Sequence, residues 1–434
     1  MLKLKPKYRH ARFRHNVSGV NYTPKQLAAF YGMPTNATVG AGKKVGVVEL
    51  GGGIYQNALT AYFASLGYPN VLPVIFKGIN GATNQPGDAD GDYVECMLDF
   101  CVIGGMAPGC QMYCYMTDNS DAGVIAAFTQ AIADGMDAIS FSWGGPENQW
   151  AAATIATLNS LFQQAAAKGI TITVAVGDSG ASDGETGNHV DFPASSPEVA
   201  GCGGTSLPIL SPSAEVVWDD GIQGGETGGG ISSLFALPSW QAKVGVPGGK
   251  FRGIPDIAGN ADPNTGWTIV IDATSGPTVV GGTSAVAPMW AAIAVYVSQT
   301  IGKNVGFLPS VLYGLPAGCF HDITSGNNGT YVAKAGWDCC TGLGTPIVSK
   351  IAAALTTPAP TPPAPTPPAP TPPAPTPPAP TPPAPTPPAP TPPAPTPPAP
   401  TPPAPTPPAP TPTPKTHTIV VTGSVTVDGK VVAS

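Results

Sequence analysis

Apolar residues in the first part of the chain form short runs that alternate with longer amphipathic stretches. The runs at 43–50 (KKVGVVEL), 136–145 (MDAISFSWGG) and 169–180 (GITITVAVGDSG) each end in or run into glycine-rich sequence. The stretches 122–135 and 151–169 have the length and spacing of helices. Apolar strands that alternate with helices predict a parallel sheet covered on both faces. We therefore expect an α/β fold whose chemistry lies at the carboxyl ends of the strands.

The composition changes sharply near the end of this globular part. We expect four segments: a basic arm at 1–20, a globular domain at 21–356, a proline-rich linker at 357–414 and a tail at 415–434. Within the linker, Thr361 to Pro410 is ten repeats of TPPAP. Such a tract favours polyproline II and predicts a semi-rigid spacer of about 150 Å at roughly 3.1 Å per residue. A ligand for SH3-type modules is the alternative, but the repeats lack flanking basic residues.

The tail reads KTHTIVVTGSVTVDGKVVAS, with two β-rich runs that meet at Asp428-Gly429. An Asp-Gly pair between such runs predicts a β-hairpin. Because a lone hairpin is marginal in water, we expect the tail to pair with another chain, a surface or its own copies. The globular domain itself is expected to be monomeric.

Charged residues make up only 10% of the chain, against roughly 25% in typical soluble domains. The net charge of -7 argues against nucleic acid as a partner, which requires a basic patch. Few ionised pairs also mean that less stability is lost in acid. No membrane span is expected, because the longest apolar helix should end near residues 298–299, short of about 20 residues. The N-terminus lacks the apolar core of a secretory signal, so the protein stays inside or a leader is absent from this chain.

The chain contains eight cysteines without a paired CxxC motif, so a zinc site is not expected. Cys319 and the adjacent Cys339 and Cys340 could form a bridge that closes a loop. Buried free thiols are an equally good interpretation.

The stretch GGTSAVAP places Ser284 between a glycine-rich turn and an apolar helix. Serine is a good helix N-cap, and this is the simpler interpretation. The alternative is a nucleophile, because the positive end of the helix dipole would stabilise a nearby oxyanion. Gly281, Gly282 and Ala285 keep the surroundings small, which an N-cap does not require.

The stretch VECMLDF places Glu95 and Asp99 four residues apart, on one face of a helix. Their neighbours are apolar, so the helix is expected to be buried rather than to present a solvated acidic face. A buried pair of carboxyl groups titrates as a unit. Such a pair can act as a general base in acid, where a histidine would already be protonated.

Two further carboxyl groups follow apolar strands. Asp178 comes directly after the strand in 169–180, where ligands bind, and could be kept protonated to donate a hydrogen bond to an oxyanion. A turn aspartate with local hydrogen bonds is the alternative. Glu49 ends another buried strand, where an unpaired carboxylate is costly, so a partner is expected.

Taken together, these motifs resemble the sedolisins, the serine-carboxyl peptidases. The resemblance runs in order over about residues 20 to 350, through VVELGGG, SFSWGGPE, GDSGASDG, HVDFPASSP, GGGISSLF, RGIPDIAGNADP, GGTSAVAP and GWDCCTGLGTP. It implies a subtilisin-like three-layer fold with a mostly parallel sheet. It also implies that Ser284 is the nucleophile, Glu95 its general base, Asp99 the residue that orients this base, and Asp178 part of the oxyanion hole.

The resemblance extends to a supporting network and a metal site. Glu49 and Trp143 match positions that extend the hydrogen bonds of the acid pair, although a packing role for the tryptophan is at least as good an interpretation. One structural Ca²⁺ is implied by DITSGNNG and KAGWD. Its ligands would be the residues Asp322, Ile323, Lys334, Gly336 and Asp338. The aspartates would give carboxylates and the others backbone oxygens, a mix that suits Ca²⁺. The family often has glycine in place of Lys334, a change that a carbonyl ligand survives.

The sequence therefore predicts an acid-acting serine endopeptidase that cleaves polypeptides outside the cell or in another acidic compartment. The long N-terminal pro-segment usual in the family is not visible in this chain. A subtilisin-type protease is one alternative, but neither His189 nor His321 lies in the HGT context that it needs. A catalytically silent surface or structural protein, tethered by its tail, is the other.

Overall fold

The computed structural model describes residues 9–10, 19–356, 425–427 and 430–432. The chain divides into one unit at Met1–Pro362 and another at Pro363–Ser434. The predicted TPPAP spacer lies outside the described residues, and the four segment boundaries remain predictions.

In the second unit, β18 (Val425–Val427) and β19 (Lys430–Val432) pair antiparallel, with Val427 opposite Lys430. This pairing agrees with the predicted hairpin. Its turn at 428–429 lies outside the described residues.

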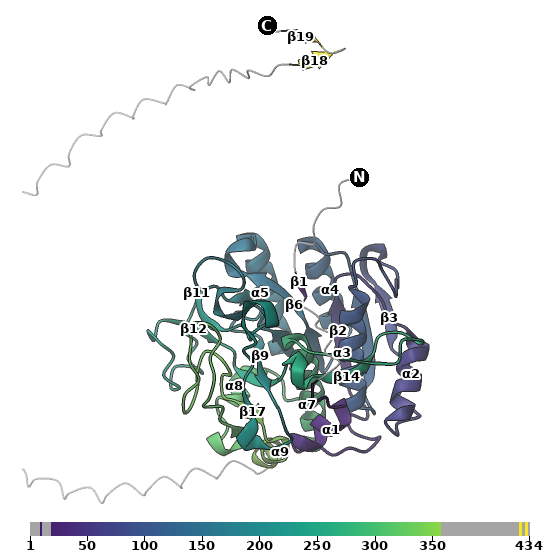
Figure 1. Cartoon of the computed structure of the whole chain (residues 1–434), viewed down its shortest axis with the longest axis vertical. Helices are drawn as coiled ribbons and strands as arrows, with labels where there is room; N and C mark the ends of the chain where they lie inside the picture. The colour runs from purple at the N-terminus through teal and green to yellow at the C-terminus, as the bar shows by residue number, and fades with distance from the viewer. Residues whose placement is uncertain (1–8, 11–18, 357–424, 428–429, 433–434) are drawn as a thin grey trace, which may run out of the picture. The chain divides into compact units, whose positions relative to one another are not determined.

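The first unit is built on an eight-stranded sheet with the order β10-β9-β7-β5-β2-β4-β3, to which β13 adds beside β9. Neighbouring strands are parallel except β10, which is antiparallel to β9. The predicted parallel sheet is therefore confirmed (Figure 1). The strands are β2 (Lys44–Glu49), β3 (Ile75–Gly78), β4 (Gln111–Met116), β5 (Ala138–Phe141), β7 (Thr171–Ala175), β9 (Ala200–Ser206), β10 (Val216–Val217) and β13 (Ile257–Asn260).

Helices cover both faces of this sheet. In β2, Val47 packs in the core that contains α3 and α7, while the next residue, Val48, packs in the core that contains α4 and α5. This alternation follows from the two-residue period of a strand. The α-helices are α1 (Pro24–Phe30), α2 (Gln56–Ser65), α3 (Tyr93–Met106), α4 (Asp121–Ala133), α5 (Ala152–Ala167), α6 (Gly221–Gly224), α7 (Val286–Ile301), α8 (Leu308–Leu312) and α9 (Val348–Thr356).

Several short strands lie outside the main sheet. The central strand of one small sheet is β6 (Trp143–Pro146), which has β8 (Asp191–Phe192) on one side and β1 (Arg9–His10) on the other. The other short strands form three antiparallel pairs: β11 (Gly230–Ala236) with β12 (Phe251–Ile254), β14 (Trp267–Val270) with β15 (Pro277–Val280), and β16 (Phe320–His321) with β17 (Thr345–Pro346).

The apolar helix α7 continues to Ile301, slightly beyond the predicted end. Together with the preceding 3-10 turn it is long and apolar enough to cross a membrane, but 78% of its most apolar window is buried inside the protein. It packs against α3, α9 and strands β5 and β7. It is therefore the central core helix of the fold.

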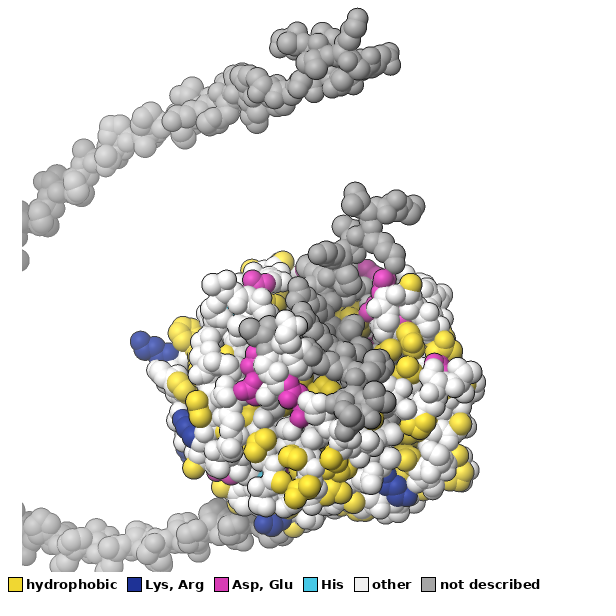
Figure 2. All heavy atoms as spheres, in the orientation of Figure 1, with side chains coloured by type: hydrophobic (Ala, Val, Ile, Leu, Met, Phe, Trp, Pro, Cys, Tyr) yellow, Lys and Arg dark blue, Asp and Glu magenta, His cyan; other side chains and the backbone are white. Residues whose placement is uncertain are grey.

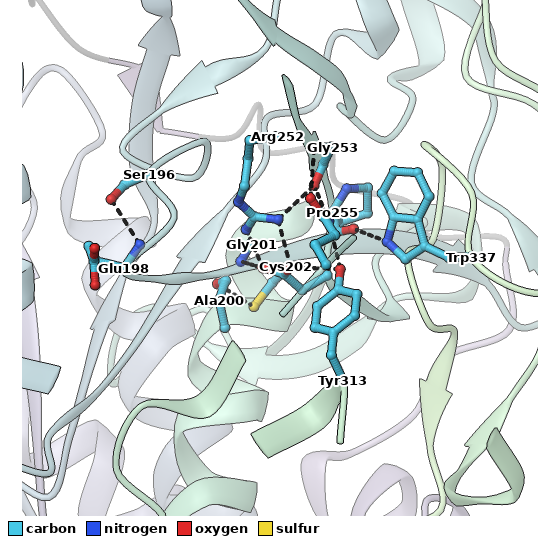
Figure 3. A network of polar contacts seen from close by, with 12 residues as sticks. Ser196, Glu198, Ala200, Gly201, Cys202, Arg252, Gly253, Pro255, Tyr313 and Trp337 are labelled. Atoms are coloured by element: carbon cyan, nitrogen blue, oxygen red, sulfur yellow. Dashed lines mark hydrogen bonds and ion pairs between the residues drawn. The ribbon is translucent and has the colours of Figure 1, made fainter. Parts of the chain in front are cut away.

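A fully buried ion pair stabilises the region between β9 and β12. The Arg252 guanidinium donates to both carboxylate oxygens of Asp256, at 2.8 and 2.6 Å, and both side chains are completely buried. Tyr313 and the backbone N–H of Gly201 donate to the same carboxylate at 2.9 and 2.8 Å. Figure 3 shows the Arg252, Tyr313 and Trp337 side chains gathered around Gly253 and Pro255.

The surface carries few charged side chains, as the composition predicts, and the cysteines are buried. Figure 2 shows a face on which uncharged side chains dominate and few lysines and arginines are visible. All eight cysteines are buried free thiols, so the structure contains no bridge between Cys319 and Cys339 or Cys340.

Candidate active site

The serine of GGTSAVAP lies in a buried turn at the start of α7. Ser284 is part of the 3-10 turn Thr283–Ala285, and the N-cap position of α7 belongs to Ala285. The N-cap interpretation of Ser284 is therefore wrong. The preceding Gly282 has a φ of 126°, which favours glycine, and a Cβ on Gly281 would lie 2.3 Å from a backbone oxygen. This turn needs both glycines to present the serine.

Helix α3 brings the acid pair to this serine. Every residue of α3 after Tyr93 is buried, and both Glu95 and Asp99 are 0% exposed. A side-chain hydrogen bond joins Ser284 to Glu95. Ser142, at the end of β5, places its Oγ 3.1 and 3.0 Å from the two Asp99 oxygens and 3.2 Å from the backbone oxygen of Ser284. The predicted burial of the pair is confirmed, and its serine neighbour is now identified.

A third carboxyl group joins the pair from the end of β2. Glu49 is 0% exposed, and the indole Nε1 of Trp143 donates to its Oε2 at 3.0 Å. The expected partner of Glu49 is thus the tryptophan, which does more than pack. The Cys96 side chain also hydrogen-bonds to Glu49.

Burial shifts the pKa of all three carboxyl groups in the same direction. Desolvation raises the pKa of Glu95 well above its usual range, and the charges of Asp99 and Glu49 raise it further, while the hydrogen bond with Ser284 lowers it. Burial and the Glu49 charge likewise raise the pKa of Asp99, against the hydrogen bond from Ser142. Burial raises the pKa of Glu49 to about 8, although the Trp143 hydrogen bond lowers it. The cluster therefore retains protons to higher pH than free carboxyl groups do.

Asp178 reaches the turn that holds the serine from the end of β7. It follows β7 and is 5% exposed. Its Oδ1 accepts hydrogen bonds from the backbone N–H of Thr283 at 2.8 Å and from the Thr283 hydroxyl at 2.7 Å. Because Thr283 directly precedes Ser284, these bonds fix Asp178 beside the serine.

Neither Ser142 nor Thr283 was predicted to be a site residue, although both lie inside motifs that carry the resemblance. Ser142 is part of SFSWGG and Thr283 of GGTS. A small hydroxyl residue next to a candidate catalytic residue was the available signal. Both residues proved to be links between elements that are far apart in the sequence.

The five residues predicted to hold calcium lie in two loop segments that meet. Asp322 Oδ2 accepts from the Gly336 N–H at 2.8 Å, and Asp338 Oδ2 accepts from the Lys334 N–H at 3.1 Å. Over the described ranges, no group of three His, Cys, Asp or Glu side chains suited to a metal is present. Two carboxylates and three backbone carbonyls would not form such a group.

The comparisons with known proteins agree with this geometry. The sequence model of the subtilase family matches residues 78–305. Kumamolisin from Bacillus sp. (strain MN-32) is 48% identical over 354 residues, which cover 77% of this chain and 63% of kumamolisin. Sedolisin from Pseudomonas sp. (strain 101) is 32% identical over 371 residues, which cover 76% of this chain and 61% of sedolisin. The chain thus spans about three fifths of the length of these relatives.

A solved structure shows the same fold. Pseudomonas sedolisin, a serine-carboxyl proteinase complexed with two molecules of pseudo-iodotyrostatin, superposes with a TM-score of 0.69 at 30% identity. The match covers 77% of this chain and 98% of that one. The chain belongs to the sedolisin family of serine-carboxyl peptidases, within the subtilases, and has their subtilisin-like α/β fold.

Proposed function

We propose that this chain is an acid-acting serine endopeptidase that hydrolyses peptide bonds in polypeptides. The observation that carries the proposal is the convergence of Ser284 with Glu95 and Asp178. Within the described part of the chain, the Ser284 hydroxyl has hydrogen-bonding partners in Glu95 and Ser142, and no histidine is among them. Carboxyl groups with raised pKa values are suited to acid–base catalysis at low pH.

The first step is attack by Ser284 Oγ on the peptide carbonyl carbon while Glu95 accepts the hydroxyl proton. Burial makes this carboxylate a strong base once one proton has left the cluster. Asp99, hydrogen-bonded to Ser142, orients Glu95 and shares the single negative charge with it. When the C–N bond breaks, Glu95 returns the proton to the leaving amine. A water molecule then repeats the sequence on the acyl-enzyme.

Asp178 acts on the developing oxyanion. Its Oδ1 already accepts two hydrogen bonds from Thr283, so a proton on this carboxyl group belongs on Oδ2. From there it can be donated to the negatively charged carbonyl oxygen. Asp178 must be protonated for this role, which is a second reason to expect activity in acid.

The edge of β6 is the natural binding place for a substrate backbone. Trp143 in β6 contacts Glu49, and Ser142 directly precedes the strand. The chain's own β1 pairs antiparallel with this edge, with Arg9 opposite Gly144 and His10 opposite Trp143. An edge that accepts one extended segment can accept a peptide in the same way.

The calcium residues fit a single structural ion. Among the described hydrogen bonds, none ends on the backbone oxygens of Ile323, Lys334 or Gly336, so these oxygens are available as ligands. Asp322 and Asp338 would complete an all-oxygen set. If this holds, EDTA lowers the unfolding midpoint of the chain, and added Ca²⁺ restores it. Asp322→Asn, on an exposed residue, should remove most of that response.

The activity is tested by peptide cleavage with the full chain from pH 3 to 8. Acid activity that is lost in both Ser284→Ala and Glu95→Ala supports the proposal. A neutral optimum that is insensitive to Glu95→Ala would instead indicate a histidine-dependent subtilisin mechanism. No cleavage at any pH would support the catalytically silent alternative. Activity in acid also fits a location outside the cell or in an acidic compartment, which we infer with it.

A further inference from the structure

A second pair of carboxyl groups lies outside the serine site, where two loops meet. Asp262 follows β13 and caps the 3-10 turn Pro263–Thr265, and Asp220 directly precedes α6. A side-chain hydrogen bond joins the two carboxyl groups. Asn264 spans them, because its backbone N–H donates to Asp262 Oδ1 at 2.6 Å and its Nδ2 donates to Asp220 Oδ2 at 2.7 Å. A hydrogen bond between two carboxyl groups requires one proton between them.

The two carboxyl groups have different surroundings. Asp262 is 4% exposed, and its Oδ2 accepts from Ser206 Oγ at 2.5 Å. Asp220 is exposed and accepts from Trp218 Nε1 at 3.2 Å. Desolvation disfavours the charged form, so the shared proton belongs to the buried member, Asp262.

The pair joins the loop that contains Asp220 to the loop that contains Asp262, and each loop borders the serine site. On one side, Glu226 N–H donates to the backbone oxygen of Asp178 at 3.2 Å, and Gly228 N–H donates to that of Gly177 at 2.8 Å. On the other side, Gly282 N–H donates to the backbone oxygen of Ala261, next to Asp262, at 2.6 Å. A change in the distance between the loops would therefore move Asp178 relative to the turn that holds the serine.

Among the ion pairs of the described residues, none involves Asp262 or Asp220. The described titratable groups near the pair include three further acids: Asp219 on the same loop, Glu226 after it, and Glu215, which is linked through Thr205 on β9. In the part of the chain that the structure describes, the ion pairs are Lys43–Asp137, Lys77–Asp134 and Arg252–Asp256. Loss of the shared proton therefore leaves two facing carboxylates.

We propose that Asp262 and Asp220 form a proton-dependent clamp that positions the loops beside Ser284 and Asp178. In acid, Asp262 donates to Asp220 and the clamp is closed. When Asp262 loses its proton, the two carboxylates repel each other and the clamp opens. Both are positioning residues, since neither belongs to the groups proposed to react. The consequence for catalysis rests on the proposed peptidase function, whereas the consequence for folding does not.

Burial of Asp262 favours a clamp that is closed in acid and opens as pH rises. It raises the pKa of Asp262 from 3.8 to about 6, with a contribution from the Asp220 charge and against the hydrogen bonds from Ser206 and Asn264. A pKa that is higher in the folded than in the unfolded state gives stability that is complete below about pH 4 and is lost as pH rises through about 6. The clamp should therefore open over the range in which an acid peptidase loses its function.

The test compares the full chain with Asp262→Asn and Asp220→Asn. The amide of Asp262→Asn donates at every pH, and Asp220→Asn removes the repulsion. Both should reduce the fall in the unfolding midpoint between pH 4 and 7 by about 2 °C or more. Asp262→Asn should have the larger effect, because it also removes the part of the shift that burial causes, and the double variant should add little to Asp262→Asn. In an active enzyme, the neutral limb of kcat/KM should move to higher pH in all three.

Ser206→Ala is the matched control, since it removes a hydrogen bond from Asp262 but leaves both carboxyl groups. It should lower the unfolding midpoint while the steep dependence on pH persists. Wild-type pH dependence of unfolding in both aspartate variants would overturn the clamp. Because Asp220 is exposed, its variant is expected to fold even if Asp262→Asn does not. If the chain is inactive but its unfolding responds as expected, the proposed peptidase function is refuted and the proposed clamp is not.

Discussion

Two clusters of buried carboxyl groups in this molecule are neutralised in opposite ways. Asp256 is surrounded by donors and forms two hydrogen bonds with the Arg252 guanidinium, so its charge is compensated by a fixed cation. Glu95 and Asp99 are buried just as deeply, and their hydrogen-bonding partners among the described residues include the serine hydroxyls of Ser284 and Ser142. Burial raises the pKa of both carboxyl groups, which favours their protonated forms.

The difference separates a structural role from a chemical one. A carboxylate held by a guanidinium through two hydrogen bonds is fixed in place by that cation. A carboxyl group neutralised by a proton can release and recover that proton during a reaction. Substitutions in the two clusters should therefore affect different properties, and the following predictions test this from the largest effect to the smallest.

Glu95→Gln should lower kcat/KM in acid by about 1000-fold or more, because the amide cannot accept the Ser284 proton. It should not lower the unfolding midpoint, since an uncharged side chain takes the place of a buried carboxyl group. Steady-state kinetics and thermal unfolding on the same preparation check both. Glu215→Gln is the control, as Glu215 is also buried but is bonded to Tyr31, Thr205 and Thr345. Equal losses in the two variants would contradict the assignment.

Asp256→Ala should lower the free energy of unfolding by about 3–5 kcal/mol, because it leaves the Arg252 charge buried without its partner. Urea denaturation measures this loss. The double variant Arg252→Met, Asp256→Leu should be less destabilised than the single one, since no charge then remains. If the double variant loses as much as the single one, packing rather than charge holds this region together.

Thr283→Val should lower kcat by about 10- to 100-fold with little change in KM, because the hydroxyl that fixes Asp178 Oδ1 is removed. The backbone N–H of residue 283 still donates, which limits the loss. Thr283→Ser keeps the hydroxyl and should recover most of the rate. An increase in KM in place of a decrease in kcat would show that this residue acts on substrate binding.

Glu49→Gln should make the stability of the fold less dependent on pH. The pKa of Glu49 is raised from 4.5 to about 8, so its protonated form gives stability that is complete below about pH 4.5 and lost as pH rises through about 8. The variant should therefore lose less stability than the parent between pH 5 and 8. Unfolding midpoints across this range check the slope, and an unchanged slope would exclude Glu49 as its source.

Much of the sheet could be predicted from the sequence, because a buried parallel strand has a clear local signature. The run 43–50 became β2 and the run 169–180 contains β7, each with a glycine-containing loop after it. The run 136–145 was harder to interpret. It contains the whole of β5 and the start of β6, which belong to different sheets. Periodicity cannot detect a strand that changes its partners.

The sequence by itself determined that Glu95 and Asp99 share a helix face, because four residues make about one turn. It also determined that Ser284 follows a glycine-rich turn and that Asp178 follows a strand. Only the tertiary structure decided that these three elements meet, and that Ser142 and Thr283 link them. It also decided that Ser284 is not the helix cap. The physical reason is that local spacing fixes direction along one element, whereas the distances that allow proton transfer depend on how separate elements pack.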